Sequence, residues 1–220
     1  MMFPKRSSAA CAPGGTRHVA SYSSTGGGAA GHPFRAGEGR YRYGGARREC
    51  RRSGRLIRKA IMTTVHAYTS TQAIVDGPAK KMRRGRAAAA NLVPASTGAA
   101  IATTKALPQY EGKFDGAAAR APVPVGSIAD ITFVTERATT VDEVNGIFCE
   151  EAESNQYSGI LGVTEDPIVS SDIVQDPCAS IVDLQSTQVV DGDLVKVMSW
   201  DDNEWGYAAQ MVREAKRMIG

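Results

Sequence analysis

The sequence lacks long apolar runs and paired cysteine motifs, and its first quarter contains few acidic or large apolar side chains. No run of 18 apolar residues occurs, so we expect no membrane-spanning helix. The four cysteines, at positions 11, 50, 149 and 178, form no CxxC pair and no zinc-type pattern with the three histidines. The N-terminus also lacks the apolar stretch of a secretory signal. We therefore expect a cytoplasmic protein with no membrane partner and no bound metal.

Residues 1–60 differ sharply in composition from the rest of the 220-residue chain. They hold eleven arginines, two lysines and two acids, for a formal charge of +11, whereas residues 61–220 carry −8. They also hold eleven of the 23 glycines and only seven Ile, Leu, Val, Met or Phe residues. Such a segment buries too little apolar surface to offset its chain entropy. We predict a disordered Arg/Gly-rich segment over 1–56 and one folded domain over 57–220.

Three interpretations of residues 1–56 remain open. The favoured one is a tail without biochemical function, or sequence that is not native to the protein. The second is a nucleic-acid contact, because eight arginines between Arg40 and Arg58 surround Tyr41 and Tyr43 and such tracts bind phosphates and stack on bases. The third is a targeting segment, which the Arg- and Ser-rich, acid-poor composition loosely resembles. On balance, a nucleic-acid partner is not expected.

Patterns of β-branched and apolar residues over 57–220 predict a sheet. Residues 61–67 read as the first strand, followed by a long irregular connection over 69–95. The Asp191-Gly192 turn predicts a hairpin that leads into a strand over 194–200. The remaining strands are expected at 114–121, 127–135, 159–163, 180–184 and 186–190.

Helices are expected at three places. One short helix runs from Ser96-Thr97-Gly98 to about 106, and a second occupies 140–153 behind the capping box that Thr140 opens. The last helix carries an apolar stripe of Ala208, Met211, Val212, Ala215 and Ile219. Strands outnumber helices, which predicts an α+β fold with an antiparallel or mixed sheet and helices on one face. No Rossmann domain is expected, because Gly37-Glu-Gly39 has no third glycine and no preceding apolar strand.

Three features carry candidate chemistry, and each also has a purely structural interpretation. His66, at a strand end, is a candidate general base or a structural histidine. Thr97 and Gly98 at a helix start, together with Arg120, suggest anion binding, or simple capping and a surface arginine. The run 201–204 suggests metal ligands, or a turn in which Asn203 caps the last helix. None of the three decides the function alone.

Taken together, their order resembles the glyceraldehyde-3-phosphate dehydrogenase family. The resemblance covers 57–220, about three quarters of the chain, and corresponds to the family's C-terminal catalytic domain. The matching stretches are Thr63-Thr-Val-His-Ala-Tyr-Thr69, Asp76-Gly-Pro78, Arg83-Arg84, Arg86-Ala-Ala-Ala, Pro94-Ala-Ser-Thr-Gly-Ala-Ala100, Arg120-Ala-Pro122 and Trp200-Asp-Asp-Asn-Glu-Trp-Gly-Tyr207.

The resemblance implies roles for individual residues. His66 matches the histidine that activates the catalytic thiol. Thr69 and Arg120 match positions that hold the phosphate of glyceraldehyde 3-phosphate, and Thr97 with Gly98 matches the site for inorganic phosphate. Asn203 matches the residue that hydrogen-bonds the nicotinamide carboxamide of NAD or NADP, which leaves no metal at 201–204.

The resemblance also implies an assembly. Residues 68 to 91 match a loop that lines a neighbouring subunit's cofactor pocket, so a homo-oligomer, a tetramer in the family, is implied. In the family, the open face of this domain packs on the nucleotide-binding half, so exposed apolar surface is expected here.

The sequence departs from the family at its nucleophile. The family's Ser-Cys-Thr-Thr-Asn-type motif would fall near Gly39, and no such motif is present. Cys50 lies in an arginine run, while Cys149 lies in the expected 140–153 helix, where a cysteine is usually an inert packing group. Position 201 is Asp where the family commonly has Tyr. Two hypotheses follow: a truncated glyceraldehyde-3-phosphate dehydrogenase that is inactive alone, or a catalytically dead protein for subunit association or phosphate binding.

Overall fold

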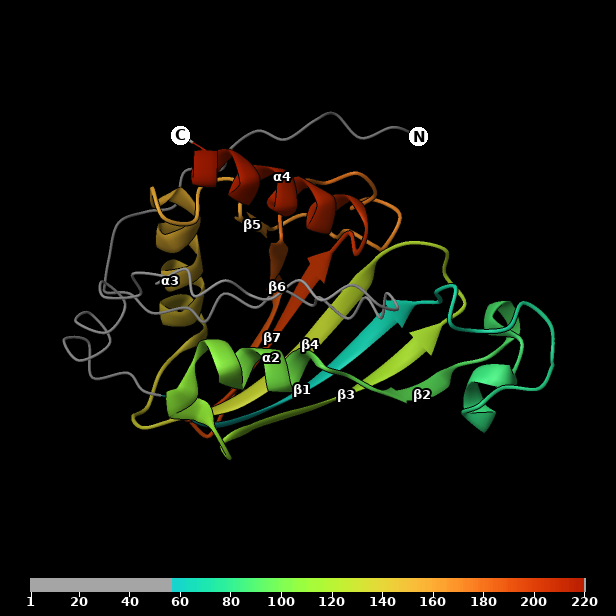
Figure 1. The fold of residues 1–220 in the computed structure, drawn as a ribbon. Coiled ribbons are helices and arrows are strands. Elements are labelled where there is room, and N and C mark those ends of the chain that lie inside the picture. Colours follow the sequence, from blue (N-terminus) through green and yellow to red (C-terminus); the bar gives the residue numbers. More distant parts are fainter. Residues whose placement is uncertain (1–56, 220) are drawn as a thin grey trace.

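The computed structural model describes residues 57–219; the disorder predicted for 1–56 concerns residues outside this range. The described chain builds one seven-stranded sheet in the order β2-β3-β1-β4-β7-β6-β5 (Figure 1). Its strands are β1 Ile57–Ala67, β2 Val93–Ser96, β3 Phe114–Ala121, β4 Ser127–Thr135, β5 Leu161–Thr164, β6 Ser180–Val190 and β7 Leu194–Asp201. β1 runs parallel to β3 and β5 parallel to β6, while the other neighbours are antiparallel. The predicted mixed sheet is confirmed.

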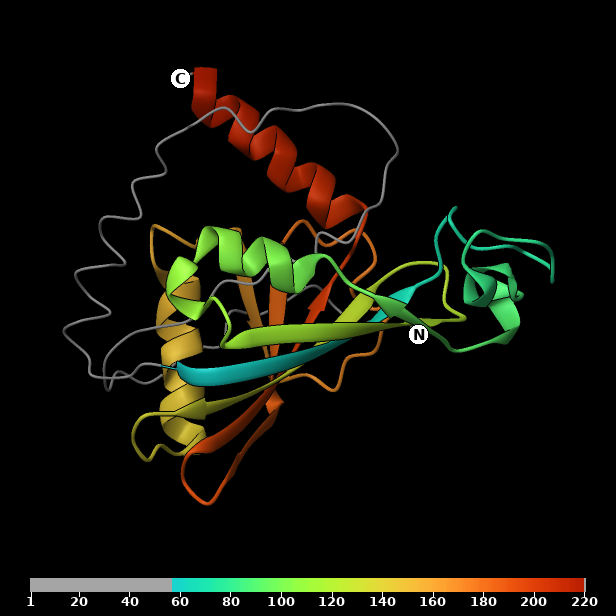
Figure 2. The ribbon, with the colours of Figure 1, turned by 60° about the horizontal axis from the view of Figure 1, so that its bottom comes forward.

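Residues 57–219 form three α-helices and three single 3-10 turns. They are α2 Ala99–Ala106, α3 Val141–Glu153, α4 Trp205–Ile219, η1 Met82–Gly85, η2 Ala88–Ala90 and η3 Pro108–Tyr110. Side chains of α2 and α3 line one pocket over the sheet, so both helices cover the same face. Figure 2 shows α4 projecting away from the sheet. No helix among residues 57–219 is long and apolar enough to cross a membrane.

The predicted Thr140 cap of α3 is present, but the Glu143 carboxylate binds Thr139 and Arg137 instead of the Thr140 backbone. Thr140 Oγ1 accepts a hydrogen bond from the Glu143 backbone N–H at 3.2 Å. The Glu143 carboxylate accepts from Thr139 Oγ1 at 2.6 Å and from the Arg137 guanidinium at 2.6 Å. The buried face of α3 packs on β5 and β6 and forms the main core with the sheet. That core contains Val144, Phe148, Cys149, Leu161, Val182, Leu184, Val195 and Val197.

The predicted hairpin is also confirmed. Asp191 and Gly192 have left-handed φ values of 50° and 75°. Together with Asp193 they form the three-residue loop between the paired residues Val190 and Leu194, which joins β6 to the antiparallel β7. Asp191 tolerates the left-handed region better than most non-glycine residues, which explains why an Asp-Gly pair marks this position.

The strand predictions were wrong at the start of β1 and missed β2. β1 begins at Ile57 rather than 61, since the exposed Arg58 and Lys59 hide its start and a register irregularity separates Ile57 from Lys59. The connection expected to be irregular contains η1, η2 and β2. β2 was missed because Pro94 argues against a strand, but β2 is an edge strand, where a proline costs no ladder hydrogen bond.

The two strands predicted at 180–184 and 186–190 form the single strand β6. Its pairing with β7 is interrupted between Asp183 and Gln188. The Asp183 carboxylate accepts hydrogen bonds from the Gln185 and Ser186 backbone N–H groups and from Ser186 Oγ, at 3.1, 3.3 and 2.9 Å. This local turn of hydrogen bonds produces the irregularity that resembled a break in the sequence.

Candidate functional site

The strand registers place four polar residues side by side across the sheet. Arg120 on β3 pairs with His66 on β1, His66 pairs with Ser127 on β4, and Ser127 pairs with Asp201 on β7. Residues in register project to the same face of a sheet, and each of these four is less than 10% exposed. We call this set the polar row. It runs from a guanidinium at one end to a carboxylate at the other.

Two competing contacts meet at one nitrogen of the His66 ring. Its Nδ1 atom lies 2.5 Å from an Arg120 guanidinium nitrogen and 2.7 Å from the Ala67 carbonyl oxygen. A guanidinium can only donate and a carbonyl oxygen can only accept, so the Arg120 contact requires an unprotonated Nδ1 and the Ala67 contact requires a protonated one. The same Arg120 nitrogen donates to the Ala67 carbonyl at 3.0 Å. The ring proton lies on Nε2 when the Arg120 contact prevails, and it lies on Nδ1, which leaves Nε2 as a base, when the Ala67 contact prevails.

The electrostatic setting of the polar row keeps His66 neutral and attracts anions. Burial lowers the pKa of His66, and the Arg120 charge lowers it further against the opposing contact with Ala67. Burial also lowers the pKa of Arg120, as does the nearby charge of Arg84 on η1. Two guanidinium groups from distant parts of the chain therefore lie close enough for their charges to interact. Such convergence suits a phosphate or carboxylate group.

Thr69 lies close to this end of the polar row. It follows β1 by two residues, and the last residue of β1, Ala67, receives the Arg120 hydrogen bond. The Thr69 backbone N–H donates to Gln72 Oε1 at 3.1 Å, and its hydroxyl lies 2.9 Å from that of Thr71. The structure thus places Thr69, Arg120 and His66 in one region.

Thr97 and Gly98 occupy a different point along the sheet. Ser96, just before them, pairs with Ala117, three positions from Arg120 on β3, or about 10 Å along the strand. Thr97 Oγ1 accepts from the Ala99 backbone N–H at 3.1 Å, and Gly98 is exposed. The hydroxyl therefore caps the start of α2, as its structural interpretation predicted.

Asn203 lies beside the polar row through the start of β4. The Gly126 backbone N–H donates to Asn203 Oδ1 at 2.8 Å, and the Gly126 carbonyl accepts from the Ala67 backbone N–H at 3.0 Å. Because its oxygen is held by Gly126, the Asn203 side chain presents its NH₂ group on the other side. Asn203 is half-buried. Its amide nitrogen suits a carbonyl acceptor such as a carboxamide oxygen.

The cap of α4 is Asp202, so the prediction that Asn203 caps this helix was wrong. Asp202 is 3% exposed, and its Oδ1 accepts from the Glu204 and Trp205 backbone N–H groups at 3.0 and 2.8 Å. Its Oδ2 accepts from the Gln175 backbone N–H at 2.8 Å. Asp202 is therefore occupied as a hydrogen-bond acceptor. Within residues 57–219, no three His, Cys, Asp or Glu side chains gather as a metal site would require.

Sequence reasoning missed the contact between Ser127 and Asp201. Ser127 Oγ donates to Asp201 Oδ1 at 2.5 Å, and both residues are buried. The departure at position 201 was visible in the sequence, but its partner lies 74 positions earlier. Only the strand register reveals this pair, since no local pattern marks Ser127.

The described cysteines are buried among apolar residues. Cys149 is 4% exposed within the α3 core, and Cys178 is 8% exposed in a second cluster with Ile173 and Ile181. Both residues are therefore shielded from solvent, which is unfavourable for a nucleophile.

Comparisons with known proteins agree with this geometry. The sequence profile described as "Glyceraldehyde 3-phosphate dehydrogenase, C-terminal domain" matches residues 53–203. Glyceraldehyde-3-phosphate dehydrogenase 2 of Streptomyces avermitilis is 51% identical over 156 residues, which are 71% of this chain and 46% of that protein. The glyceraldehyde-3-phosphate dehydrogenase of Mycobacterium tuberculosis (strain H37Rv) is 52% identical over 156 residues, 71% of this chain and 45% of that protein. That of Haloarcula vallismortis is 50% identical over 160 residues, 73% and 47% of the two chains.

The chain spans about half the length of the curated relatives it matches. The matched region contains the complete polar row and Asn203, and the described part of it folds as a mixed sheet with helices. On the profile match and these identities, the chain belongs to the glyceraldehyde-3-phosphate dehydrogenase family.

Proposed function

We propose that this chain carries the substrate-binding half of a phosphorylating glyceraldehyde-3-phosphate dehydrogenase, and that it does not oxidise the aldehyde by itself. The family reaction is the NAD(P)-dependent phosphorylating oxidation of glyceraldehyde 3-phosphate in glycolysis and gluconeogenesis. One observation carries the proposal: the registers of β1 and β3 bring His66 and Arg120 into direct contact, with the motif residue Thr69 beside them.

The proposed inactivity follows from the chemistry of the reaction. A thiolate must attack the aldehyde before hydride transfer, and phosphate must then release the acyl group from sulfur. No cysteine of this sequence lies in a motif of the family's nucleophile, and the Cys149 and Cys178 sulfurs are buried in core clusters. His66 therefore has no thiol of such a motif to activate.

The remaining residues are proposed to bind, rather than to react. Arg120 and Thr69 would hold the substrate's phosphate, and the charge of Arg84 nearby supports an anion at that position. Thr97 and Gly98 would hold inorganic phosphate at the exposed start of α2. Their separation along β3 agrees with two distinct anion sites rather than one.

Only the nicotinamide end of a cofactor fits the described residues. The Asn203 oxygen accepts from Gly126, so its NH₂ group can donate to the carboxamide of NAD or NADP. The bound cofactor would accept hydride from the substrate. No dinucleotide fingerprint occurs in the sequence to hold the adenine end. We propose a cytoplasmic location, as for glycolytic chemistry in general.

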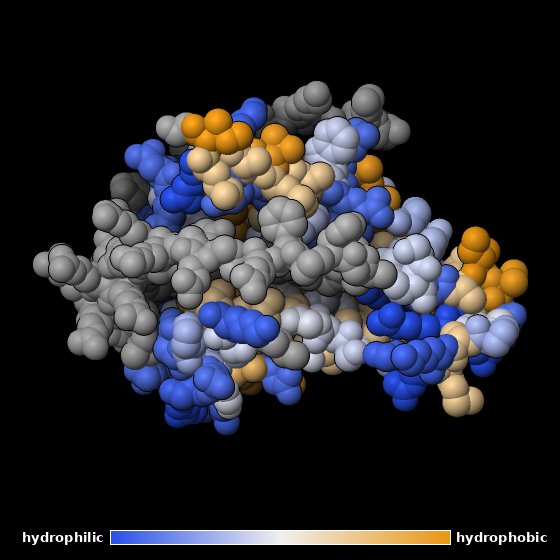
Figure 3. All heavy atoms as spheres, viewed as in Figure 1, coloured by the Kyte–Doolittle hydropathy of each residue, from blue (hydrophilic) through white to orange (hydrophobic). Residues whose placement is uncertain are grey.

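A second candidate function is subunit association without catalysis. The connection between β1 and β2 exposes Ile74, Val75 and Met82 by 85%, 73% and 89%. Figure 3 shows apolar residues gathered at this edge of the molecule. Exposed apolar clusters of this kind favour protein–protein contact, so a homo-oligomer through residues 68 to 91 is proposed.

Two measurements test the proposed function. Purified chain mixed with glyceraldehyde 3-phosphate, phosphate and NAD should form no NADH above the buffer rate, and turnover that a thiol alkylator abolishes would contradict the proposed inactivity. Calorimetry should detect glyceraldehyde 3-phosphate binding that Arg120→Met weakens at least tenfold. Lys113→Met, just before the opposite end of β3, is the matched control and should change nothing. Equal binding by both variants would remove Arg120 from the phosphate site.

A further inference from the structure

Gln72 is a buried amide in the connection that follows β1. It is 8% exposed, although glutamine usually lies at the surface. Two of its groups bind the main chain of Thr69. Gln72 Oε1 accepts from the Thr69 backbone N–H at 3.1 Å, and the Gln72 backbone N–H donates to the Thr69 carbonyl at 2.9 Å. Gln72 therefore holds both polar backbone groups of Thr69 and closes the turn 69–72.

The contact with Thr69 fixes the orientation of the Gln72 amide. A backbone N–H only donates, so the atom that faces it is the amide oxygen and the NH₂ group points elsewhere. Within residues 57–219, the buried Nε2 atom has no hydrogen-bond partner. Because Nε2 and Oε1 share one carbon, Nε2 lies within about 5.5 Å of the Thr69 nitrogen. A buried donor without an acceptor is costly, and a bound ligand that supplies the acceptor removes that cost.

The next residue ties the same turn to a guanidinium. The Ala73 backbone N–H donates to the Arg84 carbonyl at 3.1 Å, and the Ala73 carbonyl accepts from the Ala88 backbone N–H at 3.0 Å. The Arg84 charge acts on Arg120. Figure 1 shows this connection beyond the ends of β1 and β3, next to the strand end that carries Arg120. The turn therefore joins the backbone of Thr69 to that of Arg84 on the anion-attracting side of the polar row.

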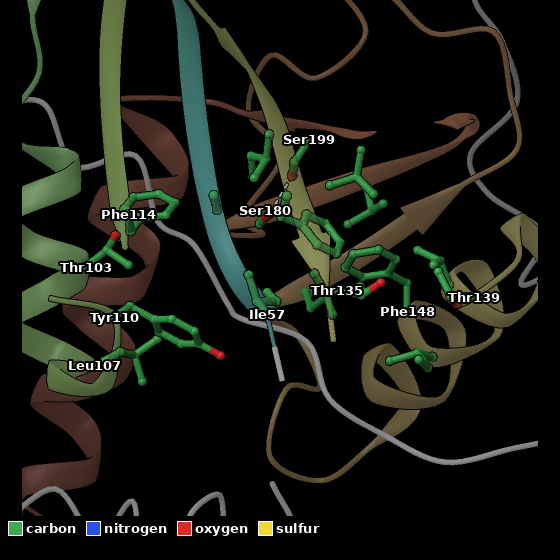
Figure 4. Close-up of a pocket in the computed structure, with 18 of the residues that line it drawn as sticks. Ile57, Thr103, Leu107, Tyr110, Phe114, Thr135, Thr139, Phe148, Ser180 and Ser199 are labelled. Atoms are coloured by element: carbon green, nitrogen blue, oxygen red, sulfur yellow. Dashed lines mark hydrogen bonds between the residues drawn. The ribbon is translucent and has the colours of Figure 1, made fainter. Parts of the chain in front are cut away.

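A pocket near the start of β1 is a poorer place for a phosphate. Apolar and aromatic side chains form most of its lining, and Figure 4 shows Ile57 and Tyr110 among them. The single arginine that lines it, Arg137, already pairs with Glu143 at 2.6 Å. Ile57 begins β1, whereas Thr69 follows the end of that strand, about 35 Å further along the chain. The turn at Thr69 offers a buried donor and two guanidinium groups instead.

We propose that the Gln72 amide serves the substrate-phosphate site through both of its polar atoms. Oε1 holds the Thr69 main chain so that the Thr69 hydroxyl and Arg120 meet one phosphate, and Nε2 donates to an oxygen of that phosphate. The NH₂ group is already withdrawn from water in the free chain, so the contact adds affinity without a new desolvation cost. This inference rests on the proposed role of Thr69 and Arg120 in binding glyceraldehyde 3-phosphate.

Two variants of the full chain separate the roles of the two atoms. Gln72→Met has a similar length and lacks both polar atoms, whereas Gln72→Glu keeps an oxygen for the Thr69 N–H and lacks the NH₂ group. Calorimetry should show glyceraldehyde 3-phosphate binding at least tenfold weaker in both. Hydrogen exchange of the Thr69 amide should be faster in Gln72→Met only. Gln109→Met, at an exposed glutamine in η3, is the matched control and should change neither measurement. Circular dichroism verifies the fold of each variant.

Proton NMR of the unaltered chain tests the Nε2 contact without a substitution. The resonances of the Gln72 NH₂ group should move downfield on saturation with glyceraldehyde 3-phosphate, because a phosphate oxygen becomes their acceptor. A residue that only supported the fold would show no such shift.

The outcomes distinguish this inference from the proposed function. If Gln72→Met bound within twofold of the unaltered chain while Arg120→Met lost binding, the role of Gln72 would be refuted and the phosphate site would stand. If Arg120→Met also bound normally, the phosphate site itself would be refuted. Unchanged NH₂ resonances, or normal binding by Gln72→Glu, would remove Nε2 from the site. Unchanged exchange of the Thr69 amide in Gln72→Met would show that Oε1 does not hold Thr69.

Discussion

The Asp202 carboxylate connects the end of β7 with the loop before β6 and with the start of α4. Because Asn203 is the next residue, replacing Asp202 tests how the chain holds Asn203 in position. The carboxylate accepts from the backbone N–H groups of Gln175, Glu204 and Trp205 at 2.8, 3.0 and 2.8 Å. The first bond ties down the loop before β6, where Gln175 adopts a left-handed φ of 64°. The other two cap α4. Asp202→Ala would leave all three donors without this acceptor.

The expected cost follows from these bonds. Loss of an N-terminal cap costs about 0.5–2 kcal/mol, and a hydrogen bond to a charged group contributes about 1.5–3 kcal/mol. The two contributions are not fully additive, because α4 can fray while the sheet stays folded. We expect Asp202→Ala to lower the free energy of unfolding by about 3 kcal/mol. Asp202→Asn keeps one oxygen acceptor and should cost about 1 kcal/mol.

Urea denaturation followed by tryptophan fluorescence measures both variants. Asp172→Ala is the matched control, because the Asp172 carboxylate accepts from one backbone N–H in an exposed turn, a contact worth less than about 1 kcal/mol. Hydrogen exchange should show faster exchange of the Gln175, Glu204 and Trp205 amides in Asp202→Ala only. If Asp202→Ala cost no more than Asp172→Ala, the idea that one carboxylate organises these segments would be refuted.

Three further predictions concern the polar row and α4. Ser127→Ala removes a hydrogen bond to the buried Asp201 carboxylate, and urea denaturation should show a loss of about 1.5–3 kcal/mol. Gly206→Ala places a Cβ 2.7 Å from the Cys178 carbonyl oxygen, so thermal unfolding should show a loss of about 1–3 kcal/mol. The pKa of His66 is lowered from 6.5, chiefly by burial, so the unfolded chain binds this proton more readily. Its contribution to stability should be complete above pH 6.5 and fall as the pH drops through the folded pKa, a dependence that His66→Gln should remove.

Local patterns predicted the parts of this fold that local chemistry determines. The Asp191-Gly192 turn, the Thr140 cap and the two strands on either side of Pro122 needed only neighbouring residues. The strand with Pro94 was missed because tolerance of a proline depends on an edge position, which only the complete sheet defines.

The sequence identified the residues of the site but not how the fold arranges them. The motifs supplied His66, Thr69, Arg120 and Asn203, because the family resemblance is carried by short stretches of sequence. Long-range strand pairing supplied the polar row, since Arg120 lies 54 positions from His66. The outward-facing apolar stripe of α4 obeys its predicted helical period, yet the period alone does not say what the stripe packs against.

The contact between Arg120 and His66 links anion binding to the state of the imidazole. While Arg120 donates to Nδ1, the ring proton lies on Nε2. A phosphate that draws the guanidinium away would free Nδ1 to donate to the Ala67 carbonyl 2.7 Å away, which moves the proton there and leaves Nε2 as an acceptor.

Nitrogen-15 NMR of the His66 ring distinguishes these two tautomers. Without ligand, the protonated nitrogen should be Nε2, and saturation with glyceraldehyde 3-phosphate should move the proton to Nδ1. Arg120→Met should show the Nδ1-protonated form with or without the ligand, because the competing donor is gone. If the tautomer stayed the same in all four samples, the guanidinium would not control the imidazole. Movement of Arg120 away from Nδ1 would then not be what makes Nε2 of His66 a proton acceptor.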